Sequence, residues 1–111
     1  MAVGQSSPFG GRTRTETLIA LRLLEESYAR EIARLLERPL SGVQKALKSL
    51  ESDGLVAGRA QGRTRLLRIS PRYFAYDELR AYVARLAEAE DELRERVGRL
   101  RRRPRRAGKR L

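Results

Sequence analysis

The chain has 111 residues, 41% of them hydrophobic, which suits one small globular domain with a modest core. It has no cysteine and no histidine, which excludes disulfides, thiolate or imidazole metal sites, and Ser-His-Asp or Cys-His catalysis. The formal net charge of +11 is high for this length and favours a polyanionic partner.

Two helices are predicted in the first part of the chain. The first runs from Arg14 to Glu26, because Thr13 followed by Glu16 fits a capping box and an apolar run comes next. The second runs from Tyr28 to Leu36, with its apolar residues on one face. Pro39 disfavours helical backbone at the residue before it and therefore ends this helix.

A third helix is predicted between Ser41 and Gly54. Ser41 followed by Gln44 fits a second capping box, and Gly54 supplies the left-handed residue that commonly ends a helix. An apolar stripe at i, i+3, i+4 and i+7 would face the core; it consists of Val43, Ala46, Leu47 and Leu50. The opposite face is polar and basic, and consists of Ser41, Gly42, Gln44, Lys45, Lys48 and Ser49.

Beyond Gly54 the hydrophobic period changes from that of a helix to that of a strand. Strands are predicted over 55–57 and 64–69, joined by a glycine-containing turn over 58–63. The turn and its flanks carry Arg59, Arg63 and Arg65, so this segment is predicted to be a β-hairpin with a basic tip.

A long helix is predicted over 77–101, because leucine recurs every seven residues and Pro104 must end the helix. We interpret its apolar side as the seam of a paired, coiled-coil-like homodimer. The seam residues are Leu79, Tyr82, Leu86, Leu93, Val97 and Leu100. The alternative is that the first half of this helix packs on its own domain and only the distal leucines need a partner.

Charge divides the chain into unequal blocks. Residues 12–75 have a balance of +6, residues 76–98 a balance of −3, and residues 99–110 hold eight basic side chains and no acid. We therefore expect a flexible leader over 1–11, a nucleic-acid-binding domain over 12–75, a dimerisation helix over 76–101 and a basic tail over 102–111.

Several function classes are not expected. The carboxylates mostly lie at helical spacings beside Arg or Lys, which indicates exposed ion pairs, and no phosphate-binding glycine loop is present. We therefore predict no enzymatic activity, no cofactor and no metal. The chain has no apolar run long enough to span a membrane and no signal-peptide pattern, so a cytoplasmic protein is expected.

The order of helices and hairpin resembles the winged helix-turn-helix domain of bacterial and archaeal transcription regulators. YAREIARLL and VQKALKSLESDGLV resemble the paired helices of the arsenical-repressor and multiple-antibiotic-resistance groups. FGGRTR and SPRYFAYDEL are similar to segments of small regulators that accompany nucleotidyltransferases. The fold class implied is mainly α with a β-hairpin wing and a long C-terminal helix. Glu37 departs from the family pattern, since many relatives have glycine there, and the metal-sensing cysteines and histidines are absent.

The resemblance implies that the polar face of the third helix enters the major groove of double-stranded DNA, while the hairpin and second helix contact the backbone. Gln44 can pair with an adenine edge, and Lys45 or Lys48 can reach guanine acceptors or phosphates. The implied DNA-binding residues are Arg30, Arg34, Ser41, Gly42, Gln44, Lys45, Lys48, Ser49, Arg59, Arg63 and Arg65.

The leading interpretation is therefore a homodimeric, sequence-specific DNA-binding regulator. Two alternatives stay open at this point. One is a nonspecific nucleic-acid-binding protein in which the arginine-rich tail dominates. The other is an adaptor that uses the winged domain as a scaffold for an unknown partner protein.

Overall fold

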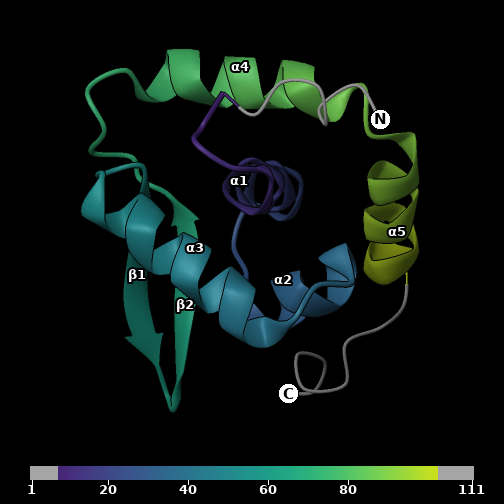
Figure 1. Ribbon diagram of the computed structural model, residues 1–111, viewed down its shortest axis with the longest axis horizontal. Helices are drawn as coiled ribbons and strands as arrows, with labels where there is room; N and C mark the ends of the chain where they lie inside the picture. Colours follow the sequence, from purple (N-terminus) through teal and green to yellow (C-terminus); the bar gives the residue numbers. More distant parts are fainter. Residues whose placement is uncertain (1–7, 103–111) are drawn as a thin grey trace.

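One central helix organises the fold. The computed structural model describes residues 8–102, and in it α1 (Arg12–Leu24) is surrounded by the other elements (Figure 1). These are α2 (Ala29–Leu36), α3 (Leu40–Ser52), β1 (Val56–Gln61), β2 (Thr64–Ile69), α4 (Tyr76–Ala87) and α5 (Asp91–Arg102). The view in Figure 1 looks down α1, with α4 above it, α5 to the right, and α2 and α3 below.

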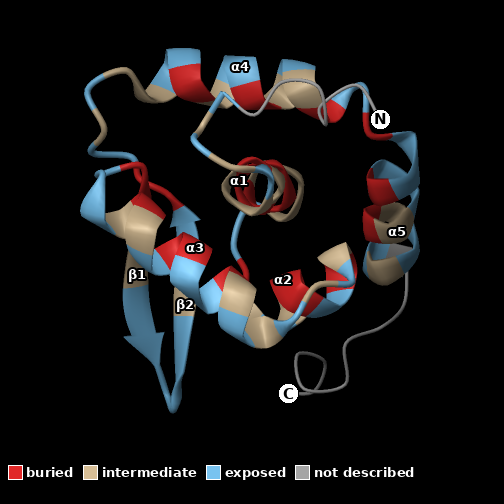
Figure 2. Ribbon diagram, viewed as in Figure 1, coloured by how far each residue is buried: buried red, intermediate tan, exposed pale blue. Residues whose placement is uncertain are grey.

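The core forms where the apolar faces of these elements meet α1. Leu18, Ile19, Ala20 and Leu21 are each at most 1% exposed, because α1 has neighbours on several sides and is apolar over most of its circumference. Figure 2 shows the buried residues on the inward sides of α2, α3, α4 and α5. The mainly helical fold class with a hairpin wing is therefore confirmed.

The start of α1 differs from the predicted capping box. The helix begins at Arg12 behind Gly11, and no side chain caps its first turn. Instead of reaching back to Thr13, the Glu16 carboxylate pairs with Arg12 at 3.3 Å and with Arg38 at 2.7 Å. The hydrogen bond to Glu16 raises the pKa of the Arg38 guanidinium. The first capping-box prediction was wrong because a distant arginine competes for the carboxylate.

The start of α3 differs in the same way, whereas its end agrees with the prediction. The helix begins at Leu40 with Pro39 before it, and no side-chain hydrogen bond caps it, so the prediction for Ser41 was wrong. At the other end, Gly54 has φ of +81°, a left-handed conformation that glycine adopts without a Cβ clash.

The turn between α2 and α3 contains a residue in an unfavourable backbone conformation. Glu37 has φ of 56° and ψ of 46°, and it is the residue at which the sequence departs from the family pattern. A side chain in this left-handed region costs about 1–2 kcal/mol, which explains why glycine is common there. The small Ala33 is buried nearby, and its carbonyl oxygen accepts a hydrogen bond from the amide of Arg38 at 3.0 Å.

The hairpin is longer than predicted on its first strand. β1 and β2 pair antiparallel from Val56 opposite Ile69 to Gln61 opposite Thr64, which leaves only Gly62 and Arg63 in the turn. The middle of β2 is also tied to the segment before α2. There, the amide of Ser27 donates to the Leu67 carbonyl at 3.0 Å, and the Leu67 amide donates to the Ser27 carbonyl at 2.7 Å.

The predicted long C-terminal helix is instead two helices, α4 and α5, which meet at a corner over residues 88–90. The amides of Ala89 and Glu90 donate to carbonyls three residues earlier, so the chain makes a tight turn there. As a result α5 packs against α1 and α2, and Leu93 and Val97 are buried in the core of their own chain. A continuous helix would leave these two residues exposed to solvent.

The ends of the chain lie largely outside the described part. The predicted leader is described only from residue 8, and the predicted basic tail only at residue 102. Within the leader, the Phe9 ring lies 5.7 Å from the Tyr82 ring of α4, measured between centroids.

Candidate nucleic-acid interface

The outer face of α3 is open to solvent. Its apolar stripe, from Val43 to Leu50, is buried as the helical period predicts. On the opposite face, Ser41, Gln44, Lys45 and Lys48 are exposed, and Gly42 is half-buried. A Cβ atom added at Gly42 would meet nothing within 4 Å, so the protein's own packing does not require glycine at this position.

Ser49 is the one predicted residue of this face that the fold draws inward. It is half-buried, and its hydroxyl accepts a hydrogen bond from the Arg14 guanidinium. The same guanidinium pairs with Asp53 at 2.9 Å. Ser49 therefore holds α3 against α1, and its side chain is engaged within the chain.

A groove of about 530 Å³ lies between α3 and the hairpin. Gln44 and Lys48 line it from α3, and Arg63 and Arg65 line it from the hairpin. The structure thus brings together side chains that the sequence placed on separate elements. Other lining residues are Tyr28, Ala29, Arg30, Leu40, Leu47, Glu51, Thr64 and Leu67. Tyr28 and Thr64 were not predicted, because no periodic signal distinguishes a groove-lining residue at the end of an element.

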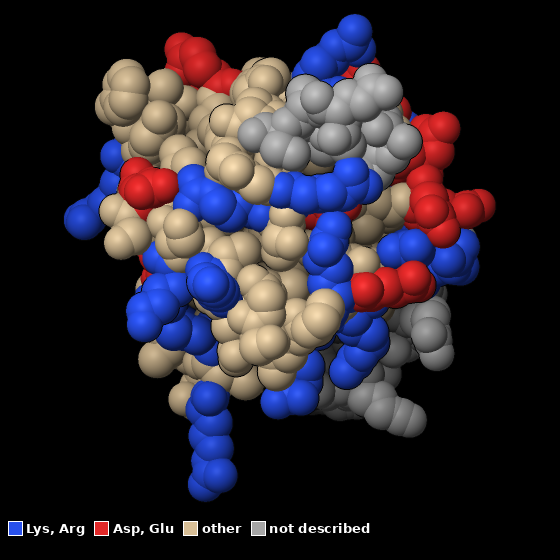
Figure 3. Space-filling view, viewed as in Figure 1, with Lys and Arg blue, Asp and Glu red and all other residues tan. Residues whose placement is uncertain are grey.

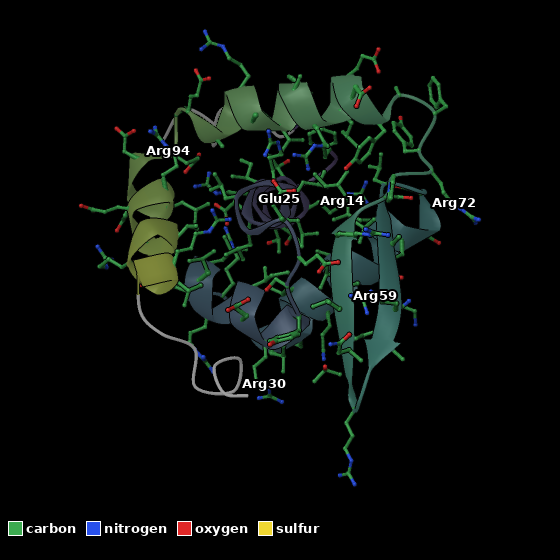
Figure 4. The ribbon with its side chains drawn as sticks, turned by 180° about the vertical axis from the view of Figure 1, so that it is seen from behind. Arg14, Glu25, Arg30, Arg59, Arg72 and Arg94 are labelled. Atoms are coloured by element: carbon green, nitrogen blue, oxygen red, sulfur yellow. The ribbon has the colours of Figure 1, made fainter. Side chains whose placement is uncertain are left out.

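Unneutralised positive charge is concentrated in the same part of the molecule. Among the described side chains of residues 8–101, seven cationic ones make no ion pair and no hydrogen bond; they are Arg30, Arg34, Lys45, Lys48, Arg63, Arg68 and Arg72. All of them belong to α2, α3, the hairpin and the loop that follows it. Figure 3 shows Lys and Arg side chains over α3 and the hairpin, with Asp and Glu gathered mainly along the α5 edge. Arg30 and Arg72 project away from the fold (Figure 4).

The arginines of α4 and α5 differ from this set. Arg80, Arg85, Arg94, Arg96 and Arg99 each pair with at least one carboxylate. Arg80, for example, lies 2.9 Å from Glu25, and this hydrogen bond lowers the pKa of the Glu25 carboxyl. These ion pairs therefore reduce the positive potential over α4 and α5. Arg68 and Arg72 were missed as candidates because nothing in the sequence marks an arginine as unpaired.

The three hairpin arginines that were predicted to bind DNA have different environments. Arg63 lies in the turn and has no partner among the described residues. Arg59 lies 3.7 Å from Glu26 and donates to the Gln61 side chain at 2.7 Å. Arg65 lies 2.7 Å from Glu51 of α3, and that hydrogen bond raises the pKa of Arg65. Of these three, only Arg63 presents an uncompensated charge.

The predicted dimerisation residues are not on one face. Leu79, Leu93 and Val97 are buried within the chain, and Leu86 and Leu100 are half-buried. Tyr82 is 46% exposed. Across residues 8–102, no helix has the length and apolar character that a membrane span requires, and no cluster of carboxylates suits a metal ion.

A protein-family model matches the part of the chain that carries this surface. Residues 14–77 match the family model described as "Sugar-specific transcriptional regulator TrmB". The matched segment runs from the first turn of α1 to the start of α4, so it contains all the candidate DNA-contacting side chains. No curated protein matches the chain at a significant level.

Several solved structures share this fold. HlyU from Vibrio cholerae is 26% identical over 79% of this chain and 86% of its own, with a TM-score of 0.61. Mb0332 from Mycobacterium bovis is 26% identical over 81% of this chain and 76% of its own, with a TM-score of 0.56. It is described as a homodimeric winged helix-turn-helix DNA-binding domain. The adhesin competence repressor of Streptococcus pyogenes is 18% identical over 96% of this chain and 74% of its own, with a TM-score of 0.62, and shows the shared fold.

Proposed function

Because the chain belongs to the TrmB family of transcriptional regulators, we propose that it binds specific sites on double-stranded DNA as a homodimer. In this proposal α3 enters the major groove, whose width of about 12 Å admits one helix. The turn of the hairpin lies against the flanking phosphates.

The distribution of unpaired cations is the observation that carries this proposal. Among the described residues, Lys45, Lys48 and Arg63 have no counter-ion, whereas Arg85 of α4 and Arg99 of α5 pair with carboxylates. Phosphates attract uncompensated cations, and release of their condensed counter-ions drives association. One side of the molecule is therefore suited to a polyanion.

The outer face of α3 offers groups with suitable chemistry for the proposed complex. The Gln44 amide can donate to and accept from an adenine edge, and Lys45 can reach guanine acceptors. Ser41 and Gly42 lie in the first turn, where backbone amides and the helix dipole favour a phosphate. Arg30 and Arg34 on α2 would contact phosphates on the other side of α3.

The test is a comparison of affinities for a selected operator and a scrambled duplex. A binding site selected from random duplexes provides the operator. Replacing both Gln44 and Lys45 with alanine is expected to lower the affinity ratio between the two duplexes by at least tenfold, since each lost base contact costs about 1–3 kcal/mol. The matched control is Arg85→Ala, because Arg85 lies on α4. An unchanged ratio in the double variant shows that α3 does not read the sequence.

Homodimerisation is supported by the homodimeric state described for Mb0332. Among the predicted dimerisation residues, Tyr82 retains the largest exposed area, and the Phe9 ring lies beside it. Two copies would present two α3 helices to half-sites about one helical turn apart. Sedimentation equilibrium should give the mass of a dimer for the native chain and of a monomer for Tyr82→Glu. A native monomer at micromolar concentration would contradict this part of the proposal.

A further inference from the structure

A single ion pair links the hairpin to the C-terminal turn of α3. Arg65 Nη1 on β2 lies 2.7 Å from Glu51 Oε1, and the Arg65 and Glu51 side chains are 54% and 24% exposed. Within the described residues, Arg65 is the only arginine of β1 or β2 with a carboxylate partner on α3. The pair therefore connects two elements that line the same groove.

Gly58 makes room for this pair. It lies opposite Leu67 in the hairpin, beside the path that the Arg65 side chain takes toward α3. A Cβ atom added at Gly58 would lie 2.8 Å from Arg65 Cζ and 2.9 Å from Leu67 Cδ2. Real Cβ atoms do not approach other heavy atoms so closely, so any larger residue forces the guanidinium to move.

The location of Glu51 is unusual for a surface that attracts phosphates. The carboxylate lines the groove together with Gln44, Lys48 and Arg63. Its negative charge opposes an approaching phosphate, and its bond to Arg65 neutralises a cation that could otherwise bind one. An acid at this point weakens sequence-independent binding.

We propose that Glu51 is a positioning residue for specificity, which holds Arg65 across Gly58, braces the hairpin on α3 and keeps this guanidinium from phosphates. The inference rests on the proposed DNA-binding function. It assigns the phosphate contact of the hairpin to Arg63 rather than to Arg65. Loss of the brace therefore increases affinity for any duplex and decreases discrimination between duplexes.

The first experiment measures binding of the full chain to a scrambled duplex at several salt concentrations. Glu51→Ala frees one cation, so the slope of log affinity against log salt should steepen by about 0.9. Between 50 and 200 mM salt the variant should therefore lose roughly threefold more affinity than the native chain does. At 50 mM salt it should bind more tightly than the native chain. The matched control is Glu88→Ala, which frees Arg85 on α4 with the same change in net charge and should leave the slope unchanged.

A double variant separates release of Arg65 from simple removal of a negative charge. If Arg65 is the liberated group, the steeper slope disappears in Glu51→Ala/Arg65→Gln. Gly58→Ala keeps both charges but displaces the guanidinium, so it should reproduce the slope of Glu51→Ala. A slope gain that persists in the double variant, or a native slope in Glu51→Ala, overturns the proposal.

Amide hydrogen exchange of the free protein gives a readout that does not depend on DNA. The brace predicts faster exchange for β1 and β2 amides in Glu51→Ala than in the native chain and in Glu88→Ala. Exchange at the native rate overturns the brace. If the native chain binds no duplex at all, the proposed function fails, and the exchange result alone then decides whether Glu51 braces the hairpin.

Discussion

Gly42 lies in the first turn of α3, and a methyl group added there would meet no other atom of the protein within 4 Å. Glycine in a helix is less favourable than alanine by about 0.5–1 kcal/mol. Gly42→Ala is therefore expected to raise the free energy of unfolding by that amount, as measured by urea denaturation. If this turn approaches a phosphate backbone, the same variant should bind its operator several-fold more weakly.

The two measurements on Gly42→Ala have opposite expected signs, which makes the variant informative. General loss of structure would lower stability and affinity together. A variant that is more stable and binds as well as the native chain would show that the first turn of α3 stays clear of the duplex.

At the residue scale, local periodicity predicted which side chains would be exposed but not which would be paired. Gln44, Lys45 and Lys48 are exposed as the helical period of α3 requires. The partners of Ser49 and Arg65 could not be predicted, because they lie 35 and 14 positions away in the chain. Tertiary pairing of this kind depends on the packing of α1 against α3 and of the hairpin against α3.

At the scale of elements, hydrophobic period predicted the helices and strands well and their boundaries less well. The strand over Thr64–Ile69 agrees with its prediction, because its alternating residues have one buried face. The corner over 88–90 was missed, since Glu88 and Ala89 are good helix formers. Burial of Leu93 and Val97 on α1 and α2 overrides that local preference.

The corner between α4 and α5 contains a buried carboxyl group. Glu90 is 9% exposed, and its Oε2 atom has no hydrogen-bond partner. Burial, and then the nearby Glu16 carboxylate, raise the pKa of Glu90. The folded state therefore holds this proton more tightly than the unfolded chain. This contribution favours folding below the ordinary carboxyl pKa and is lost as pH rises through the raised value.

Glu90→Gln is expected to remove the free-energy cost of burying the charged carboxylate at neutral pH. At pH 7 the free energy of unfolding should increase by on the order of 1 kcal/mol, because a buried charge is replaced by a neutral amide. The difference from the native chain should vanish near about pH 4, where the native carboxyl is protonated as well. Denaturation curves at several pH values test this, with the exposed Glu88→Gln as control. An equal effect of the two substitutions would contradict the role of burial.

At the scale of the whole molecule, charge is separated between the two ends of the described chain. The described cations that lack a partner lie between Arg30 and Arg72, whereas most described arginines of α4 and α5, such as Arg80 and Arg99, pair with carboxylates. The sequence predicted this separation from its charge balance, because the acids over 76–98 lie at helical distance from arginines. The net positive electrostatic potential is therefore strongest on the α3 side of the molecule. This favours an orientation in which a polyanion approaches that side.

The salt dependence of duplex binding should report this separation. Each phosphate contact contributes about 0.9 to the slope of log affinity against log salt, so Lys48→Gln should reduce the slope by about that amount. Arg85→Gln removes the same charge from α4 and should leave the slope within error of the native value. Equal slopes for the two variants would mean that overall charge, rather than its placement, governs binding.

The antiparallel bridge between Ser27 and Leu67 fixes the hairpin at its midpoint as well as at its base. Beyond this bridge the hairpin extends past the body of the protein. The extension consists only of the last residue pairs, up to Gln61 and Thr64, and the two turn residues. Peptides grafted between Gly62 and Arg63 should therefore be accommodated without loss of folding, whereas lengthening the chain before Leu67 would shift the strand register. The reach of this loop along a duplex can thus be changed independently of the helices.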